Sequence, residues 1–82
     1  MIRNENEKIT LLEIYSASFL ELKGIPAELE LRNGKVLFCF PRNDEVYQLL
    51  NQYNSNEAAP IADFVSALKN LKARMFVKKG PR

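Results

Sequence analysis

The 82-residue chain contains no histidine, one cysteine and three scattered glycines. Without histidine, neither a Ser-His nor a Cys-His nucleophile can be assembled, and histidine-based acid–base catalysis is excluded. One cysteine without histidine provides no ordinary zinc site. Gly24, Gly34 and Gly80 are too far apart in the sequence to form a phosphate-binding loop. We therefore expect no enzyme activity, no metal and no cofactor.

Long apolar stretches are also missing. The first residues lack the continuous apolar segment of a signal peptide, and no stretch approaches the roughly 18 apolar residues of a membrane span. Cys39 cannot form a disulfide within one chain, which suits a reducing compartment. The sequence thus predicts a cytoplasmic protein without membrane contact or a small-molecule substrate.

The composition is that of a small folded domain, with 46% hydrophobic and 27% charged residues. A chain of this length has a thin core, and thin cores often gain stability from a partner or a second copy. We therefore expect one domain that binds a protein partner, with a homodimer as the favoured form.

A helix is predicted from about Leu11 to Lys23. Thr10 and Glu13 have the spacing of a capping box, and Ile9 and Ile14 have that of a hydrophobic staple. Gly24 can adopt the left-handed conformation that ends a helix, and Pro26 prevents continuation. The predicted buried face of this helix consists of Leu11, Leu12, Tyr15, Phe19 and Leu22.

A β-hairpin is predicted next, because Asn33-Gly34 is the preferred pair for a type I′ turn and apolar residues alternate on both sides. A two-residue loop places Leu31 opposite Val36 and Leu29 opposite Phe38 on the core side. The other side would carry Glu28, Glu30 and Arg32 on the first strand, and Leu37 and Cys39 on the second.

Two further helices are expected, at about Asp44–Tyr53 with Asn43 as N-cap, and from Pro60 to about Phe76. The third has a predicted buried stripe of Ile61, Phe64, Val65, Leu68, Leu71 and Met75. The fold class is thus α+β in the order α-β-β-α-α, with a two-stranded antiparallel hairpin packed on helices. We expect a flexible segment at residues 1–9, the domain at 10–76 and a basic flexible tail at 77–82.

Three stretches, "EIYSASFLELKGI", "RNGKVLFCFPRNDEVYQLL" and "ADFVSALKNLKARMF", carry a resemblance. Together they resemble a family of small bacterial domains of unknown function, with a helix ending in Lys-Gly, a hairpin, an acidic helix start and a final helix. This resemblance implies a fold but no activity. A looser similarity in topology is to the N-terminal docking domains of peptide-synthetase assembly lines, which implies a dimer that binds a partner's short segment.

The hairpin supplies the favoured candidate site, a protein interface of Glu28, Glu30, Leu37 and Cys39. A two-stranded ribbon has two edges with unpaired backbone groups, and a strand from another chain can satisfy them. Residues 1–8 or the final helix can instead cover Leu37 and Cys39. Glu28 and Glu30 are also typical of a solvated face, and Cys39 of a packing residue rather than a reactive thiol.

The basic C-terminus supplies the alternative, weak non-specific binding of nucleic acid. Residues 64–82 contain six Lys or Arg and no acid. The candidate contacts are Lys69, Arg74, Lys78, Lys79 and Arg82. These side chains scatter around the helix, whereas a groove-reading helix gathers them on one face. Cations in the last turns also stabilise the negative end of a helix dipole, so both interpretations stay open.

Overall fold

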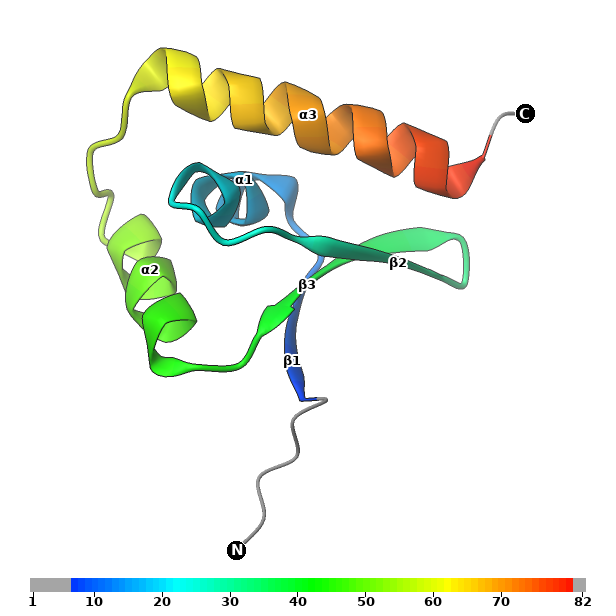
Figure 1. The fold of residues 1–82 in the computed structure, drawn as a ribbon, viewed down its shortest axis with the longest axis horizontal. Helices are drawn as coiled ribbons and strands as arrows, with labels where there is room; N and C mark the ends of the chain where they lie inside the picture. Colours follow the sequence, from blue (N-terminus) through cyan, green and yellow to red (C-terminus); the bar gives the residue numbers. More distant parts are fainter. Residues whose placement is uncertain (1–6, 81–82) are drawn as a thin grey trace, which may run out of the picture.

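The computed structural model describes residues 7–80 of the chain (Figure 1). Within this range the protein is a small α+β domain of three helices and three strands. The elements in chain order are β1 (Lys8–Leu11), α1 (Ile14–Leu22), β2 (Glu28–Arg32), β3 (Lys35–Pro41), α2 (Asp44–Asn54) and α3 (Ile61–Lys79).

The sheet is three-stranded and antiparallel, in the order β1-β3-β2, so the predicted two-stranded ribbon is incomplete. β1 pairs along the free side of β3, with Lys8 opposite Pro41 and Leu11 opposite Phe38. This pairing satisfies backbone groups on β3 that a bare hairpin would leave open. The predicted segment 1–9 therefore ends inside a strand, and its residues 1–6 lie outside the described range.

The β2–β3 hairpin has the predicted turn and register. Asn33 and Gly34 have φ angles of 54° and 80°, the two positive values that a type I′ turn requires. Leu31 lies opposite Val36, and Leu29 lies opposite Phe38. The local sequence signal therefore determined this part of the sheet.

Helix α1 begins three residues later than predicted. Thr10 belongs to β1 and does not cap it; the N-cap is Glu13, whose carboxylate accepts a hydrogen bond of 2.9 Å from the Ser16 hydroxyl. The predicted end is confirmed, since Gly24 has a φ of 97°. The amide of Ile25 donates to the carbonyl of Leu20, and that of Gly24 to Glu21, which is a Schellman motif.

The other two helices lie close to their predicted positions. The Asn43 side chain accepts a hydrogen bond of 2.8 Å from the amide of Val46, which confirms the predicted cap of α2. α3 follows Pro60, as expected, but continues to Lys79. Residues 77–79 of the predicted tail are therefore helical.

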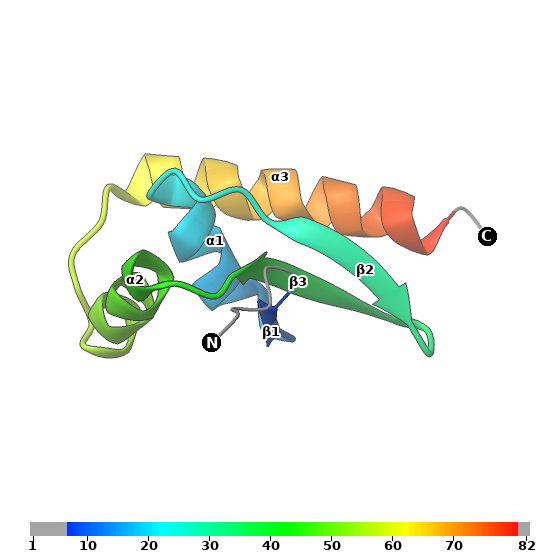
Figure 2. The same cartoon turned by 60° about the horizontal axis from the view of Figure 1, so that its bottom comes forward.

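Helices α1 and α3 pack on one face of the sheet, and α2 packs against α1 (Figures 1 and 2). This two-layer domain measures 43 × 36 × 17 Å. The buried core brings together residues of both layers: Ala17, Leu20, Ala27, Val36, Phe38, Phe40, Val46 and Leu71.

Fewer helical side chains are buried than the sequence predicted. Of the predicted stripe on α3 only Leu71 is buried, while Ile61 and Val65 are exposed. Leu12 and Tyr15 of the predicted first-helix stripe are exposed as well. A single face of a three-stranded sheet is too small to cover a 19-residue helix along its whole length.

Candidate interaction surface

The outer face of the sheet, opposite the helices, contains the four residues predicted as an interface. Glu28 lies beside Cys39, and Glu30 beside Leu37. The structure differs from expectation in exposure, because Leu37 is only 9% exposed and Cys39 only 2%. The single chain already covers these apolar side chains, so they offer little area to another protein.

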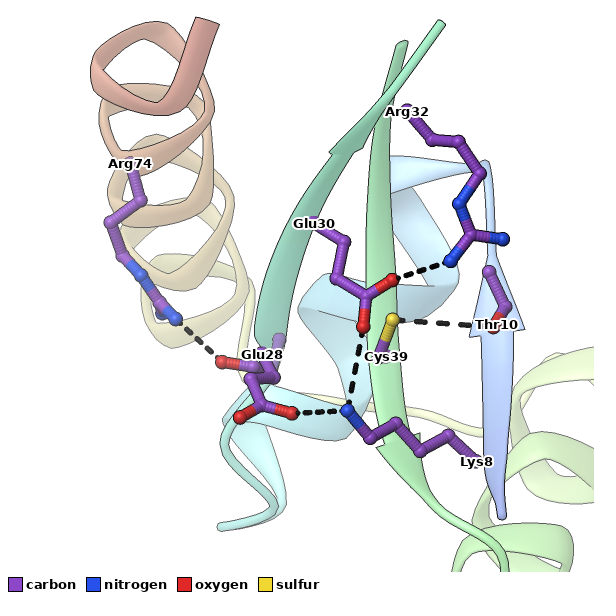
Figure 3. A network of polar contacts seen from close by, with 8 residues as sticks. Lys8, Thr10, Glu28, Glu30, Arg32, Cys39 and Arg74 are labelled. Carbon is purple, nitrogen blue, oxygen red and sulfur yellow. Dashed lines mark hydrogen bonds and ion pairs between the residues drawn. The ribbon is translucent and has the colours of Figure 1, made fainter. Parts of the chain in front are cut away.

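Charged side chains of the sheet form a network over this face (Figure 3). The Lys8 ammonium lies 2.8 Å from the Glu28 carboxylate and 3.4 Å from that of Glu30, and Arg32 lies 2.9 Å from Glu30. Hydrogen bonding to the two carboxylates raises the pKa of Lys8, and bonding to Lys8 lowers the pKa of Glu28. Lys8 thereby links β1 to β2 across the central strand.

Cys39 lies beneath this network. Burial raises the pKa of its thiol, although a contact of 4.0 Å with the Thr10 hydroxyl opposes this change. A raised pKa leaves little of the nucleophilic thiolate at neutral pH. The environment of Cys39 is therefore that of a packing residue.

The free edge of β2 is the second feature of interest. In a two-residue hairpin the residues that flank the turn bond to each other, so Arg32, Glu30 and Glu28 direct their backbone groups towards β3. The groups of Ala27, Leu29 and Leu31 point the other way, out of the sheet.

The outward groups of Ala27 are satisfied by side chains. Its amide donates to Glu21 Oε2 at 2.7 Å, and its carbonyl accepts from Arg74 Nη2 at 2.6 Å. Arg74 Nη1 lies 2.8 Å from the same Glu21 oxygen. We call these three residues the Glu21–Arg74 clamp; Figure 3 shows Arg74 reaching from α3 to the backbone next to Glu28.

Beyond the clamp the edge is open. Within residues 7–80, no other strand pairs with this side of β2, and the backbone bonds outside the regular elements do not involve Leu29 or Leu31. A hollow of about 300 Å³ lies beside it, lined by Leu29, Arg74, Val77 and Lys78. Leu31 is 47% exposed and Val77 is 75% exposed. An unpaired strand edge thus adjoins exposed apolar side chains.

The hairpin edges are predictable from the sequence as a general feature, whereas the clamp is not. Glu21 and Arg74 are 53 positions apart and appear as ordinary surface charges. Only the packing of α3 across α1 and the start of β2 brings them together. No local pattern in the sequence indicates this contact.

The predicted nucleic-acid contacts are not gathered in one place. Arg74 lies in the clamp, and Lys78 lines the hollow beside β2. Lys69 and Lys79 are exposed elsewhere on α3, and Arg82 lies outside the described residues. At about 100° per residue, Lys69 and Lys79 instead share a flank of α3 with Lys72 and Phe76.

No group of three or more Cys, Asp or Glu side chains in residues 7–80 could hold a metal ion. None of the helices in this part of the chain is both long and apolar enough to cross a membrane. A second hollow, of about 230 Å³, is bordered by Phe19, Tyr53, Ile61 and Phe64.

Comparison with known proteins places the chain in a family. Neither the curated proteins nor the solved structures include a match, so the similarity to docking domains of peptide-synthetase assembly lines gains no support. One family model, described as "Domain of unknown function (DUF5659)", matches residues 6–77. This match covers far more than half of the sequence and includes every strand and nearly all of α3. The chain therefore belongs to the DUF5659 family of domains of unknown function.

Proposed function

We propose that this domain is a protein-interaction module that binds a β-strand of another chain along the free edge of β2. The observation that carries the proposal is the open stretch at Leu29 and Leu31. Here backbone groups point out of the sheet beside a hollow with apolar walls. An incoming strand would satisfy these groups, the binding mode known as β-augmentation.

The clamp defines where such a strand would end. Because Glu21 and Arg74 already bind the backbone of Ala27, pairing can extend only from Leu29 towards the turn. Alternate side chains of the added strand would lie next to Val77 and Lys78 on the inner side, and next to Glu28 and Arg32 on the outer side. The main chain provides affinity in this arrangement, and the side chains select the partner.

This role requires no chemistry from the domain itself. We propose that the chain is not an enzyme, since the lack of histidine and the buried, protonated Cys39 leave no obvious nucleophile or base. Its contribution would be a preformed strand edge on a two-layer scaffold.

Amide hydrogen exchange in dilute protein tests the edge directly. The amides of Leu29 and Leu31 should exchange quickly, whereas that of Glu30 should be protected, because it points towards β3. Equal protection of all three amides would contradict the geometry.

Proline substitution then tests binding. Leu31→Pro removes an amide that faces away from the sheet, a position where edge strands accept proline, so the fold should persist. Glu30→Pro, the matched control, removes an amide bonded to β3 and should destabilise the domain. Extended heptapeptides selected by phage display against the wild type should protect the amides of Leu29 and Leu31 on binding. Peptides that bind Leu31→Pro equally well would contradict the proposal.

A second candidate function is non-specific nucleic-acid binding through one flank of α3. The observation in its favour is that Lys69, Lys72 and Lys79 share this flank with Phe76, which is exposed. Lysines can neutralise phosphates, and an exposed aromatic ring can stack on a base. Arg74 and Lys78 would not take part, because they lie towards β2.

Fluorescence anisotropy with single-stranded and duplex DNA tests this second function. Binding at low salt should be independent of sequence and weaken with a log–log slope of about −0.7 per phosphate contact on single strands. A Lys69→Glu, Lys72→Glu double variant should lose it, while Lys35→Glu, on the hairpin, should not. No binding at low salt removes this candidate.

A further inference from the structure

We infer that the strand added to the edge of β2 is β2 of a second copy, which runs antiparallel and is centred on Glu30. This inference rests on the function proposed above and names the partner. The two copies would form one continuous six-stranded sheet from two three-stranded ones. A two-fold axis would pass between the two Glu30 residues, so the same surface is used twice.

The sequence of β2, "ELELR", is complementary to itself when read in the opposite direction. With Glu30 opposite its counterpart, Leu29 lies opposite the partner's Leu31, and Glu28 lies opposite the partner's Arg32. Each Leu29–Leu31 pair consists of residues whose backbone groups point outward, so each pair can exchange two hydrogen bonds. All four bonds form within the extended part of the strand.

Charges on the outer face match in this register. The Glu28 side chain is 70% exposed and that of Arg32 is 66% exposed, so each can reach an opposite charge across the axis in addition to its partner in its own chain. The two Glu30 side chains at the centre carry like charges. Each, however, is already paired with Lys8 and Arg32 of its own chain.

Neighbouring registers are less favourable. A centre at Leu29 would place Glu28 opposite Glu30, and like charges directly opposite are destabilising. That register would also need the backbone of Ala27, which Glu21 and Arg74 occupy. A centre at Leu31 would need hydrogen bonds from Asn33, which has turn geometry with a φ of 54°. The Glu30 centre avoids the occupied backbone of Ala27 and the turn at Asn33, and it places one pair of like charges in opposition instead of two.

The helical layer determines what else a second copy would meet, because α3 lies on the free-edge side of β2 (Figure 3). The α3 flank next to Arg74, on the side away from Leu71, carries Ser66, Asn70, Ala73 and Val77 at helical spacing. All four are exposed, and three of them are small or short polar residues. In the proposed dimer the α3 helices of the two copies would face each other along this flank.

Charge reversal tests the register by sedimentation velocity. In Glu28→Arg, two Arg–Arg pairs replace the opposite-charge pairs, and in Arg32→Glu two Glu–Glu pairs do so. Each variant alone should dimerise about tenfold more weakly than the wild type. An equimolar mixture should recover wild-type affinity, because a mixed dimer restores both opposite-charge pairs.

Recovery in the mixture excludes effects confined to one chain, such as loss of the Lys8–Glu28 contact. Lys35→Glu, a charge reversal elsewhere on the hairpin, serves as control and should dimerise like the wild type. A wild-type protein that stays monomeric at millimolar concentration would overturn the inference, as would single variants that dimerise normally. The proposed strand-binding function would then still be decided by the peptide and Leu31→Pro experiments.

Discussion

Arg74→Ala should destabilise the domain far more than removal of any other α3 cation tested beside it. The guanidinium donates to Glu21 at 2.8 Å and to the carbonyl of Ala27 at 2.6 Å. The Arg74 side chain is 40% exposed, but that of Glu21 is only 16% exposed, and Ala27 is buried. The substitution would therefore leave a carboxylate and a carbonyl without their shared donor in a mostly dry place.

The size of the effect follows from these two bonds. A hydrogen bond to a charged group contributes about 1.5–3 kcal/mol, and the exposure of Arg74 favours the low end. Together the two bonds should contribute about 3 kcal/mol. Domains of this size have a total free energy of unfolding of about 4–12 kcal/mol, so the loss is a large fraction of it. In a thermal melt it corresponds to a fall of at least about 10 °C in Tm.

Circular dichroism of wild type, Arg74→Ala and Lys78→Ala provides the measurement. Lys78 lies one turn further along the same helix and is exposed, so its substitution should change stability by less than about 0.5 kcal/mol. A double-mutant cycle with Glu21→Ala should show positive coupling between Glu21 and Arg74. If Arg74→Ala and Lys78→Ala melt at the same temperature, the clamp does not stabilise the fold, and the reasoning is refuted.

Three further outcomes are expected from stability measurements. Burial raises the pKa of Cys39 above its ordinary 9.0 and that of Tyr53 above its ordinary 10.0, because the folded protein favours the neutral form of each group. The free energy of unfolding that these two groups contribute should therefore be fully present below pH 9 and be lost as pH rises through their raised pKa values. Cys39→Ala should remove the first part of this decline, and an unchanged pH profile would contradict the assignment. Gly24→Ala should cost about 1–2 kcal/mol from backbone strain alone, because φ is 97° and the added Cβ meets no atom within 4 Å. Leu71→Ala, at the buried centre of α3, should cost about 2–5 kcal/mol in urea unfolding, and a loss below 1 kcal/mol would contradict its core position.

The features that sequence analysis predicted correctly depend on a few adjacent residues. Asn33-Gly34 fixes both the turn and the pairing of β2 with β3, because a two-residue loop allows one register. Gly24 ends α1 and Asn43 begins α2 through contacts within one helical turn. Such signals do not depend on how the domain packs.

The assignment of residues 8–11 failed because two local patterns compete there. Thr10 and Glu13 have capping-box spacing, yet Ile9 and Leu11 alternate with polar residues as in a strand. The long-range pairing with β3 decides between them, since it satisfies backbone groups along a sheet edge. A helix starting at Leu11 would leave that edge open and Cys39 less covered.

The candidate site was only partly predictable for a related reason. The pattern of β2 and β3 correctly placed Glu28, Glu30, Leu37 and Cys39 on one face. Their burial depends on β1, and the open edge at Leu29 depends on where Arg74 reaches from α3. Both contacts join residues separated by long stretches of chain, which periodicity does not encode.

The position of β1 in the sheet has a consequence for synthesis on the ribosome. Of the three strands, β1 leaves the exit tunnel first, but the strand that it pairs with in the described part of the chain is β3, about 30 residues later. At roughly 5–20 residues per second, the nascent chain carries its apolar "ITLL" segment without that partner for about 2–6 s. The hairpin, in contrast, can close within microseconds of its emergence. We therefore expect the β2–β3 hairpin to form before β1 adds to it, so that the first of these three strands to be made is the last to be placed.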